Sequence, residues 1–326
     1  MYLEFYGLIR SPFEMTPDPA FLYLGESHQE GLATLVYGVQ ARKGFVLLTG
    51  EVGTGKTTLL HSLLAQLDPS TASAFIFNPK LGTHDFFRVL FDEFGIRDEC
   101  RTKAEYLMAL NAFLIERLER DETALLIIDE AQNLSPEMLE EVRLLSNLET
   151  PTHKLLQIML VGQPELSGLL ARPELRQLRQ RIVLRHDLRP FTSAELDDYV
   201  GERLRLAGYT GKGIFNRGAL KELFAVTGGV PRLVNDEPLV LRGGAEQLEV
   251  GKLGGLVGEE EVVLPVEHQN RDRHPAQVVD LVHLGKGVLE VQPCHHHHAG
   301  LQPWLDRHHD RTHGRAPADA HEGEPI

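Results

Sequence analysis

The chain contains 326 residues, with a formal net charge of −14 and two cysteines, Cys100 and Cys294. This length leaves room for two domains and a sizeable core, while the negative charge excludes a global basic field that would attract nucleic acid. Two cysteines are too few for a disulfide framework. The first residues lack the features of a signal peptide, and no stretch approaches the roughly 20 apolar residues of a membrane span. The composition predicts a soluble protein of a reducing cytoplasm, in which a local basic patch is still compatible with the overall charge.

Up to residue 190, apolar runs alternate with helix-forming segments. An arm over residues 1–25, rich in aromatic residues and prolines, is predicted to be ordered, irregular and docked on the main domain. The segment from Ser27 to Glu30 has the form of a capping box and predicts a helix that runs to Arg42. Strands that are continuous apolar runs between helices indicate a mostly parallel sheet covered on both faces. The predicted strands are 45–49, 74–77, 124–128, 155–161 and 182–184, and the helices are 57–67, about 84–94, about 103–120 and one from Pro136 with Ser135 as N-cap.

After Pro190 the pattern becomes helical only. A second capping box, from Thr192 to Glu195, predicts the first of two helices, at about 193–207 and 216–226. From residue 236 the composition changes, because the rest of the chain contains no Phe, Tyr, Met or Ser. We interpret this tail as translated out of its ancestral frame, or alternatively as a divergent or disordered extension. Four histidines at 295–298 beside Cys294 could bind Zn²⁺ or Ni²⁺, with adventitious affinity of an unstructured tail as the favoured alternative.

A glycine-rich turn between the first strand and its helix carries the clearest chemistry. It matches G-x-x-x-x-G-K-[ST], the loop that cradles nucleotide phosphates with backbone N–H groups and a helix N-terminus. Lys56 is expected on the β- and γ-phosphates and Thr57 on Mg²⁺. A chance glycine turn beside a lysine is the alternative, which the flanking strand and helix disfavour. The predicted nucleotide-binding residues are Gly50, Glu51, Val52, Gly53, Thr54, Gly55, Lys56, Thr57 and Thr58.

Two acids, Asp129 and Glu130, follow directly on the apolar run 125–128. They are expected at the carboxyl edge of the sheet, where ligands bind in open α/β folds. Asp129 is predicted to hold Mg²⁺ together with Thr57, and Glu130 to act as general base toward the attacking water. Alone this pattern is weak, because acids often close a strand. The upstream phosphate loop makes it a strong prediction.

Taken together, these motifs resemble those of AAA+ ATPases. More narrowly, they resemble the general secretion pathway protein A group and its relatives in pilus and exopolysaccharide assembly. The resemblance implies a P-loop NTPase fold with an AAA+ type parallel sheet flanked by helices, a small helical lid and an irregular tail. It divides the chain into an arm (1–25), a nucleotide-binding α/β domain (26–190), a partial lid (191–235) and an atypical tail (236–326). The residues that carry it lie at 6–8, 11–13, 16–24, 44–58, 129–134, 161–166 and 228–233.

The resemblance also implies roles for three polar residues. Gln163 matches the sensor-1 position, with a turn-capping amide before Pro164 as the alternative. Arg181 is the chosen arginine finger, which would reach a neighbouring subunit's nucleotide; Arg179 is close behind it, and the other arginines of this segment form a solvated basic face. Arg232 matches sensor 2, a lid arginine on the nucleotide phosphates, with an ordinary helix-start arginine as the alternative.

Two further features concern the arm and the end of the lid. In the arm, Phe13 and Tyr23 either cover the edge of the sheet or line an adenine pocket, and both readings are compatible. The lid departs from the family pattern, because Pro238 breaks its last helix just after residue 235. Coupling through sensor 2 is therefore in question.

The function implied is ATP binding and Mg²⁺-dependent hydrolysis that drives assembly or regulation of a secretion, pilus or exopolysaccharide export machine. The expected cofactors are ATP and Mg²⁺. The expected partners are further copies of the chain and a membrane-associated secretion or export protein, with peripheral association at the inner membrane but no insertion, and nucleic acid is disfavoured. One alternative is a DNA-transaction ATPase of the transposition-helper type. Another is a nucleotide-binding protein whose turnover is impaired by the incomplete lid.

Overall fold

The computed structural model describes residues 2–13, 23–77, 81–211, 213–236, 241–242 and 249–250, and all of them fall in one compact unit. The predicted tail therefore lies almost wholly outside the described residues, as do the histidines at 295–298. None of the described helices combines the length and the apolar character that a membrane span requires. The α-helices are α1 (Tyr2–Phe5), α2 (Glu26–Gln40), α3 (Lys56–Gln66), α4 (Thr83–Phe94), α5 (Lys103–Glu119), α6 (Pro136–Leu145), α7 (Pro164–Leu170), α8 (Arg176–Arg181), α9 (Ser193–Leu206), α10 (Arg217–Thr227) and α11 (Pro231–Asp236), with 3₁₀ turns η2 (Ala131–Asn133) and η3 (Pro173–Leu175).

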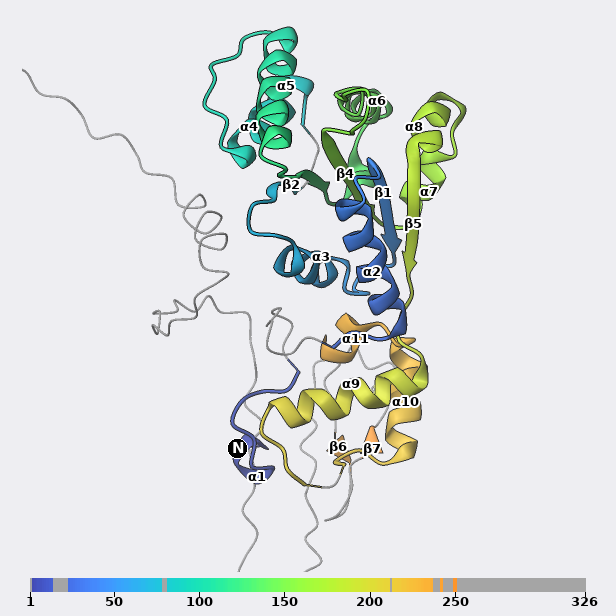
Figure 1. Cartoon of the computed structure of the whole chain (residues 1–326). Helices are drawn as coiled ribbons and strands as arrows, with labels where there is room; N and C mark the ends of the chain where they lie inside the picture. The colour runs from blue at the N-terminus through green and yellow to red at the C-terminus, as the bar shows by residue number, and fades with distance from the viewer. Residues whose placement is uncertain are drawn as a thin grey trace, which may run out of the picture. The chain divides into compact units, whose positions relative to one another are not determined.

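Five parallel strands form the central sheet, in the order β2-β3-β4-β1-β5 (Figure 1). The strand β4 thus lies between β1 and β3, which brings the ends of all three to the same edge of the sheet. The predicted α/β fold with a parallel sheet is confirmed. The strands are β1 (Phe45–Gly50), β2 (Ala72–Ile76), β3 (Ala124–Ile128), β4 (Leu156–Gly162) and β5 (Ile182–Leu188).

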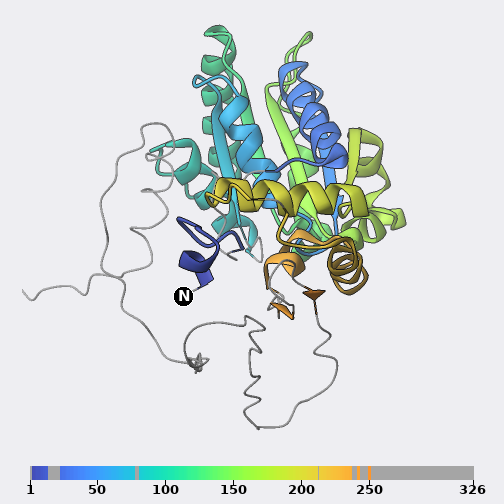
Figure 2. The ribbon, with the colours of Figure 1, turned by 90° about the horizontal axis from the view of Figure 1, so that it is seen from below.

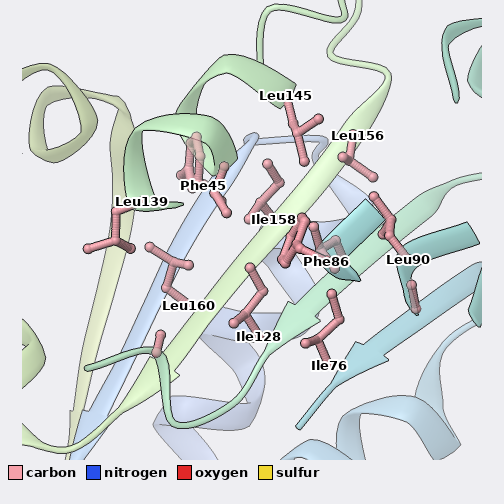
Figure 3. Packing of buried hydrophobic residues seen from close by; sticks show 14 of the residues in the cluster. Phe45, Ile76, Phe86, Leu90, Ile128, Leu139, Leu145, Leu156, Ile158 and Leu160 are labelled. Carbon is pink, nitrogen blue, oxygen red and sulfur yellow. The ribbon is translucent and has the colours of Figure 1, made fainter. Parts of the chain in front are cut away.

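Apolar side chains cover both faces of this sheet, as the continuous apolar runs predicted. One face packs against α4–α8 in a single cluster in which Phe86, Leu126 and Ile158 are fully buried (Figure 3). The other face packs against α2 and α3. Gly38 permits the close approach of α2, because a Cβ atom there would lie 2.6 Å from Val46 Cγ2 on β1. This core fixes the strand ends that carry the polar residues.

Of the three helix caps predicted from the sequence, at Ser27, Ser135 and Thr192, two are correct and one is wrong. Ser135 Oγ accepts from Met138 N at 3.2 Å, and Thr192 forms a complete capping box with Glu195. Ser27, in contrast, is not an N-cap, because α2 begins at Glu26 and Ser27 is buried inside the helix. Glu195 Oε1 accepts from Glu26 N at 2.6 Å. A carboxylate from a distant helix thus replaces the local cap that the sequence suggested.

Two strand predictions also need correction. β5 runs to Leu188 rather than ending at 184. It is an edge strand in which exposed residues alternate with less exposed ones, and its second half contains the polar residues 185–187, so a search for apolar runs stops too early. Between residues 191 and 236 the described elements are all helices, as predicted. Within the tail, Leu241–Arg242 pairs antiparallel with Glu249–Val250, a short pairing that the sequence pattern did not predict.

The helices α9, α10 and α11 lie together (Figure 2). Their buried side chains share a small apolar core, and we call these three helices the helical cluster. The described residues of the arm dock on these helices. Ile9 N donates to Ala207 O at 2.8 Å, and the buried Arg203 donates to Pro12 O at 3.1 Å. Phe13 packs edge-on against Phe215. The interpretation in which Phe13 and Tyr23 cover the edge of the sheet is therefore wrong, because both rings pack against the helical cluster.

The domain boundaries at residues 25, 190 and 235 remain predictions.

Replacing Phe86 by alanine should test the main core. Its side chain is 0% exposed, so Phe86→Ala is expected to lower the free energy of unfolding by about 3 to 5 kcal/mol. The matched control is Met108→Ala on the neighbouring α5, where the side chain is 65% exposed and the change should stay within about 0.5 kcal/mol. Urea unfolding of both variants measures the difference, and equal losses would contradict the assigned core.

Candidate functional site

The turn after β1 is shaped by two glycines in the left-handed region. Gly53 has φ 83° and Gly55 has φ 98°, a conformation that other residues adopt only with strain. Gly55 is also the N-cap of α3, so the helix begins directly at the end of the turn. Thr54 is fully buried and donates through Oγ1 to Glu51 O at 2.8 Å. The backbone thus has the form that the phosphate-loop motif requires.

Lys56 lies inside this turn with only 7% of its surface exposed. Its ammonium group donates to Gly50 O at 2.7 Å and to Glu51 O at 3.0 Å. Burial lowers the pKa of Lys56, while the carboxylates of Glu130 and Asp129 act in the opposite direction. The lysine is therefore held at the centre of the turn, facing the acid pair.

Asp129 and Glu130 close β3, as predicted, and face the phosphate loop. Asp129 is 5% exposed, and its Oδ2 accepts from Thr57 Oγ1 at 3.5 Å. Burial raises the pKa of Asp129, and the neighbouring Glu130 adds to the rise, whereas hydrogen bonds from Glu130 N and Thr57 and the charge of Lys56 oppose it. The two residues predicted to bind Mg²⁺ are thus brought together, although they lie 72 positions apart in the sequence.

Glu130 takes an unusual backbone conformation, with φ 52° and ψ 36°. Such a left-handed non-glycine residue is strained, and strain of this kind gathers at functional sites. Its Oε2 accepts from Gln163 Nε2 at 3.1 Å and from the Gln132 amide. The acid is therefore held in place by amides from two different segments.

Gln163 stands at the tip of β4, between the phosphate loop and the acid pair, as the strand order requires. It also forms the N-cap position of α7, but its side chain makes no capping hydrogen bond. The turn-capping reading is therefore wrong, and the amide instead contacts Glu130. Its sensor-1 role remains a prediction.

Arg232 reaches the phosphate loop through its backbone. Arg232 N donates to Gly53 O at 3.2 Å, and a Cβ atom at Gly53 would lie 2.6 Å from Arg232 Cβ. The helix α11 is described over Pro231–Asp236, and Val234 on it is fully buried in the helical cluster. The predicted break at Pro238 lies outside the described residues. This packing places Arg232 beside the loop, whereas its contact with phosphate stays a prediction.

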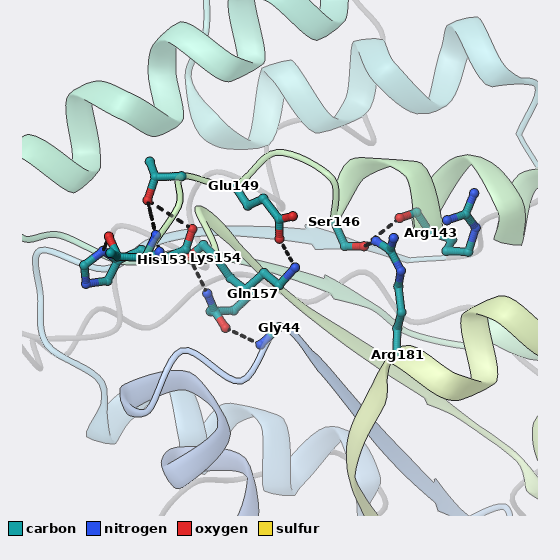
Figure 4. A network of polar contacts seen from close by, with 10 residues as sticks. Gly44, Arg143, Ser146, Glu149, His153, Lys154, Gln157 and Arg181 are labelled. Carbon is teal, nitrogen blue, oxygen red and sulfur yellow. Dashed lines mark hydrogen bonds and ion pairs between the residues drawn. The ribbon is translucent and has the colours of Figure 1, made fainter.

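Arg181 lies at the opposite edge of the sheet. It precedes Ile182, which is in register with Phe45 at the start of β1, so roughly 17 Å of strand separates it from the loop of its own chain. Its guanidinium donates to Ser146 Oγ (Figure 4), whereas Arg179 is exposed. Neither arginine reaches the site within one chain.

Comparison with known proteins agrees with this geometry. Residues 39–170 match the model of an AAA domain. General secretion pathway protein A of Aeromonas hydrophila is 46% identical over 236 residues, which cover 72% of this chain and 43% of that protein. Residues 39–170 therefore form an AAA domain, and the chain is similar to general secretion pathway protein A. It spans less than half the length of that relative.

Solved structures show the same AAA+ fold at lower identity. Cdc6p from Pyrobaculum aerophilum is 20% identical with a TM-score of 0.50, covering 68% of this chain and 64% of that one. The ORC2 protein of Aeropyrum pernix, in ADPNP–ADP complexes, is 16% identical with a TM-score of 0.50, covering 68% of this chain and 65% of that one. At these identities the likeness concerns the fold alone.

Sequence reasoning missed two residues of the AAA+ site. His28 on α2 is buried, and its Nε2 contacts Thr54 O at 2.8 Å; burial lowers the pKa of His28, so the neutral imidazole is favoured, with Nε2–H as the donor to that carbonyl. Gln132 contacts both Glu130 and Gln163 N. The position of Gln132 two residues after the acid pair was a usable signal, whereas nothing in the sequence linked His28 to the loop.

Asp129→Asn should reveal the cost of burying this carboxylate. Because the pKa of Asp129 is raised in the folded protein, its ionisation opposes folding above the folded pKa and has no effect below the unfolded pKa of about 3.9. The variant is therefore expected to be more stable than the parent at pH 8, with a gain that disappears as the pH falls between these two pKa values.

Urea unfolding across this pH range measures the effect. Asp98→Asn, at an exposed position, is the control and should show no such trend. A gain for Asp129→Asn that is independent of pH, or that grows in acid, would contradict the assignment.

Proposed function

We propose that this chain is a Mg²⁺-dependent ATPase that serves a secretion or export machine. One observation carries the proposal: the hydrogen bond between Thr57 and Asp129 joins the phosphate loop to the acid pair, so both motifs belong to one site. The proposal is further supported by the matched AAA domain, which spans both motifs.

Nucleotide binding would rest on the loop over 50–58. Its backbone N–H groups and the start of α3 supply positive potential for phosphate oxygens, and Lys56 supplies a charge beside them. Thr57 and Asp129 fit Mg²⁺, because a hydroxyl and a carboxylate oxygen in contact are hard donors, and Mg²⁺ in such sites is held by one or two side chains together with phosphates and water. Bound there, Mg²⁺ would neutralise charge on the β- and γ-phosphates.

Hydrolysis would proceed by attack of water in line with the γ-phosphate. A bond forms between the water oxygen and phosphorus, the bond from phosphorus to the β–γ bridging oxygen breaks, and ADP leaves with that electron pair. Glu130 accepts a proton from the water. Gln163 orients the water or the γ-phosphate, and Arg232 supports the phosphates from the lid.

The cellular role follows from the resemblance to general secretion pathway protein A. We assign the chain to ATP-driven assembly or regulation of a secretion, pilus or exopolysaccharide export machine, through a partner at the inner membrane. The chain would act in the cytoplasm as a homo-oligomer, with peripheral membrane association. The DNA-transaction alternative gains no support, because the likeness to Cdc6p and to the ORC2 protein concerns the fold alone and the net charge is −14.

Two substitutions separate binding from turnover. Lys56→Ala should abolish ATP binding, because the loop loses its buried positive charge. Glu130→Gln should keep ATP affinity within about twofold and lower kcat by at least about 100-fold, as expected for loss of a general base. Fluorescent-nucleotide titration and phosphate release measure the two effects.

Lys221→Ala and Glu137→Gln, both at exposed positions, are the matched controls and should resemble the parent. Equal turnover in Glu130→Gln and the parent would remove Glu130 from its role. A parent chain that binds ATP without hydrolysing it would favour the alternative of impaired turnover.

The arginine finger predicts a shared active site. Because Arg181 and Arg179 lie far from the loop of their own chain, turnover per subunit should rise with protein concentration, and Arg181→Ala should lower it by about 10³-fold. Mixing Arg181→Ala with Lys56→Ala should restore part of the activity, because each variant supplies what the other lacks. If Arg179→Ala, and not Arg181→Ala, shows this behaviour, the finger is Arg179. Arg217→Ala on α10 is the control and should behave like the parent. Turnover per subunit that does not change with protein concentration, without rescue in the mixture, would exclude a shared site.

A further inference from the structure

We propose that Gln132 is a positioning residue, which fixes the carboxylate of Glu130 as the base for water attack. This inference rests on the proposed ATPase function, but it assigns a role to a residue that neither the phosphate loop nor the acid pair includes. It is built on the hydrogen bonds around η2, the turn that directly follows Glu130.

Gln132 bridges the acid pair and the next strand. Its Nε2 donates to Glu130 Oε2, and its Oε1 accepts from Gln163 N at 3.1 Å. The same Glu130 oxygen also accepts from Gln163 Nε2 at 3.1 Å. A closed set of three hydrogen bonds thus joins the end of β3 to the end of β4.

The backbone around Glu130 supports this placement. Glu130 is in the left-handed region, and Asn133 N donates back to Glu130 O at 2.9 Å. The chain therefore turns sharply after Asp129 and brings Gln132 back over the acid that lies two positions before it. Such a strained turn persists only where its surroundings determine it.

Gly162 leaves the space that Gln132 occupies. A Cβ atom at Gly162 would lie 2.5 Å from Gln132 Oε1, a separation that forces one of the two to move. Gly162 has no left-handed backbone to account for it, so the requirement at this position is close packing, with Gln132 and with Leu166 beside it. A second residue, outside the turn, thus controls the position of the Gln132 amide.

The chemistry of the arrangement selects one oxygen of Glu130. Two amide donors engage Oε2, whereas Oε1 has no hydrogen-bond partner among the described residues. The two amides hold Oε2 and restrict rotation of the carboxylate, which leaves Oε1 to accept the proton of the attacking water. Without Gln132 the carboxylate would keep a single tether and lose this orientation.

The test is a set of double-variant cycles in the full chain. Gln132→Met keeps the length of the side chain and removes both hydrogen bonds; we expect kcat to fall by at least about tenfold, while ATP affinity stays within about twofold. Gly162→Ala should lower kcat in the same direction, by displacing Gln132. Combined with Gln132→Met it should cause no further loss of kcat, because Gly162 affects Glu130 only through Gln132, whereas its contact with Leu166 affects the unfolding temperature.

A second cycle separates positioning from general damage. Adding Gln132→Met to Glu130→Gln should leave the residual rate unchanged, because Gln132 acts through Glu130. Asn133→Ala, an exposed neighbour in the same turn, is the control and should match the parent. The proposal would be overturned if the losses in kcat were additive in either cycle. It would also be overturned if Gln132→Met left kcat unchanged or raised it, or if it lowered ATP affinity and the unfolding temperature together.

Hydrogen exchange distinguishes failure of this inference from failure of the ATPase proposal. The Gln163 amide proton is bound to Gln132 Oε1, so its exchange should accelerate in Gln132→Met and not in Asn133→Ala, whether or not the parent hydrolyses ATP. A parent without turnover but with this acceleration would refute the ATPase proposal alone. Unchanged exchange at Gln163 would refute the bridge itself.

Discussion

The position of β4 between β1 and β3 is the constraint on which the rest of the site depends. Parallel strands end at one edge of a sheet, so this order sets Gln163 between the phosphate loop and the acid pair. Because β4 separates β1 from β3, the hydrogen bond between Thr57 and Asp129 joins the segments that follow these two strands across the end of β4. The packing on both faces of the sheet holds the three strand ends in this arrangement, and the polar residues there need only short turns to meet.

The helical cluster is joined to the phosphate loop and to α2 by hydrogen bonds that involve backbone groups. Arg232 N bonds to Gly53 O, and Glu195 accepts from the first N–H group of α2. Phe191 N bonds to Gly229 O, and a Cβ atom at Gly229 would collide with Phe191 O. A movement of these helices would therefore change the hydrogen bonds at Gly53 in the loop and at Glu26 at the start of α2.

The two edges of the sheet carry different chemistry. The carboxyl edge holds the loop, the acids and the amides of Gln132 and Gln163, all directed toward one site. The amino edge holds Arg181, bound to the buried Ser146. The guanidinium of Arg181 lies too far from the phosphate loop of its own chain to contact a group bound there. Within one chain, the arginine instead has a structural contact.

The sequence by itself determined the sheet, the phosphate loop and the acid pair. Apolar runs and the spacing of glycines are local patterns, and they fix strands and turns through interactions between residues that are near neighbours in the chain. It also gave correct caps at Ser135 and Thr192, where donor and acceptor are near neighbours. Only the tertiary structure decided that Glu195 caps α2, that the arm docks on the helical cluster, and that His28 and Gln132 belong to the site. Each of these depends on contacts between residues that share no local pattern, or on a left-handed turn at Glu130 that no propensity predicts. The physical reason is the same in each case: a hydrogen bond to a distant partner can replace the nearest one once packing has brought that partner within reach.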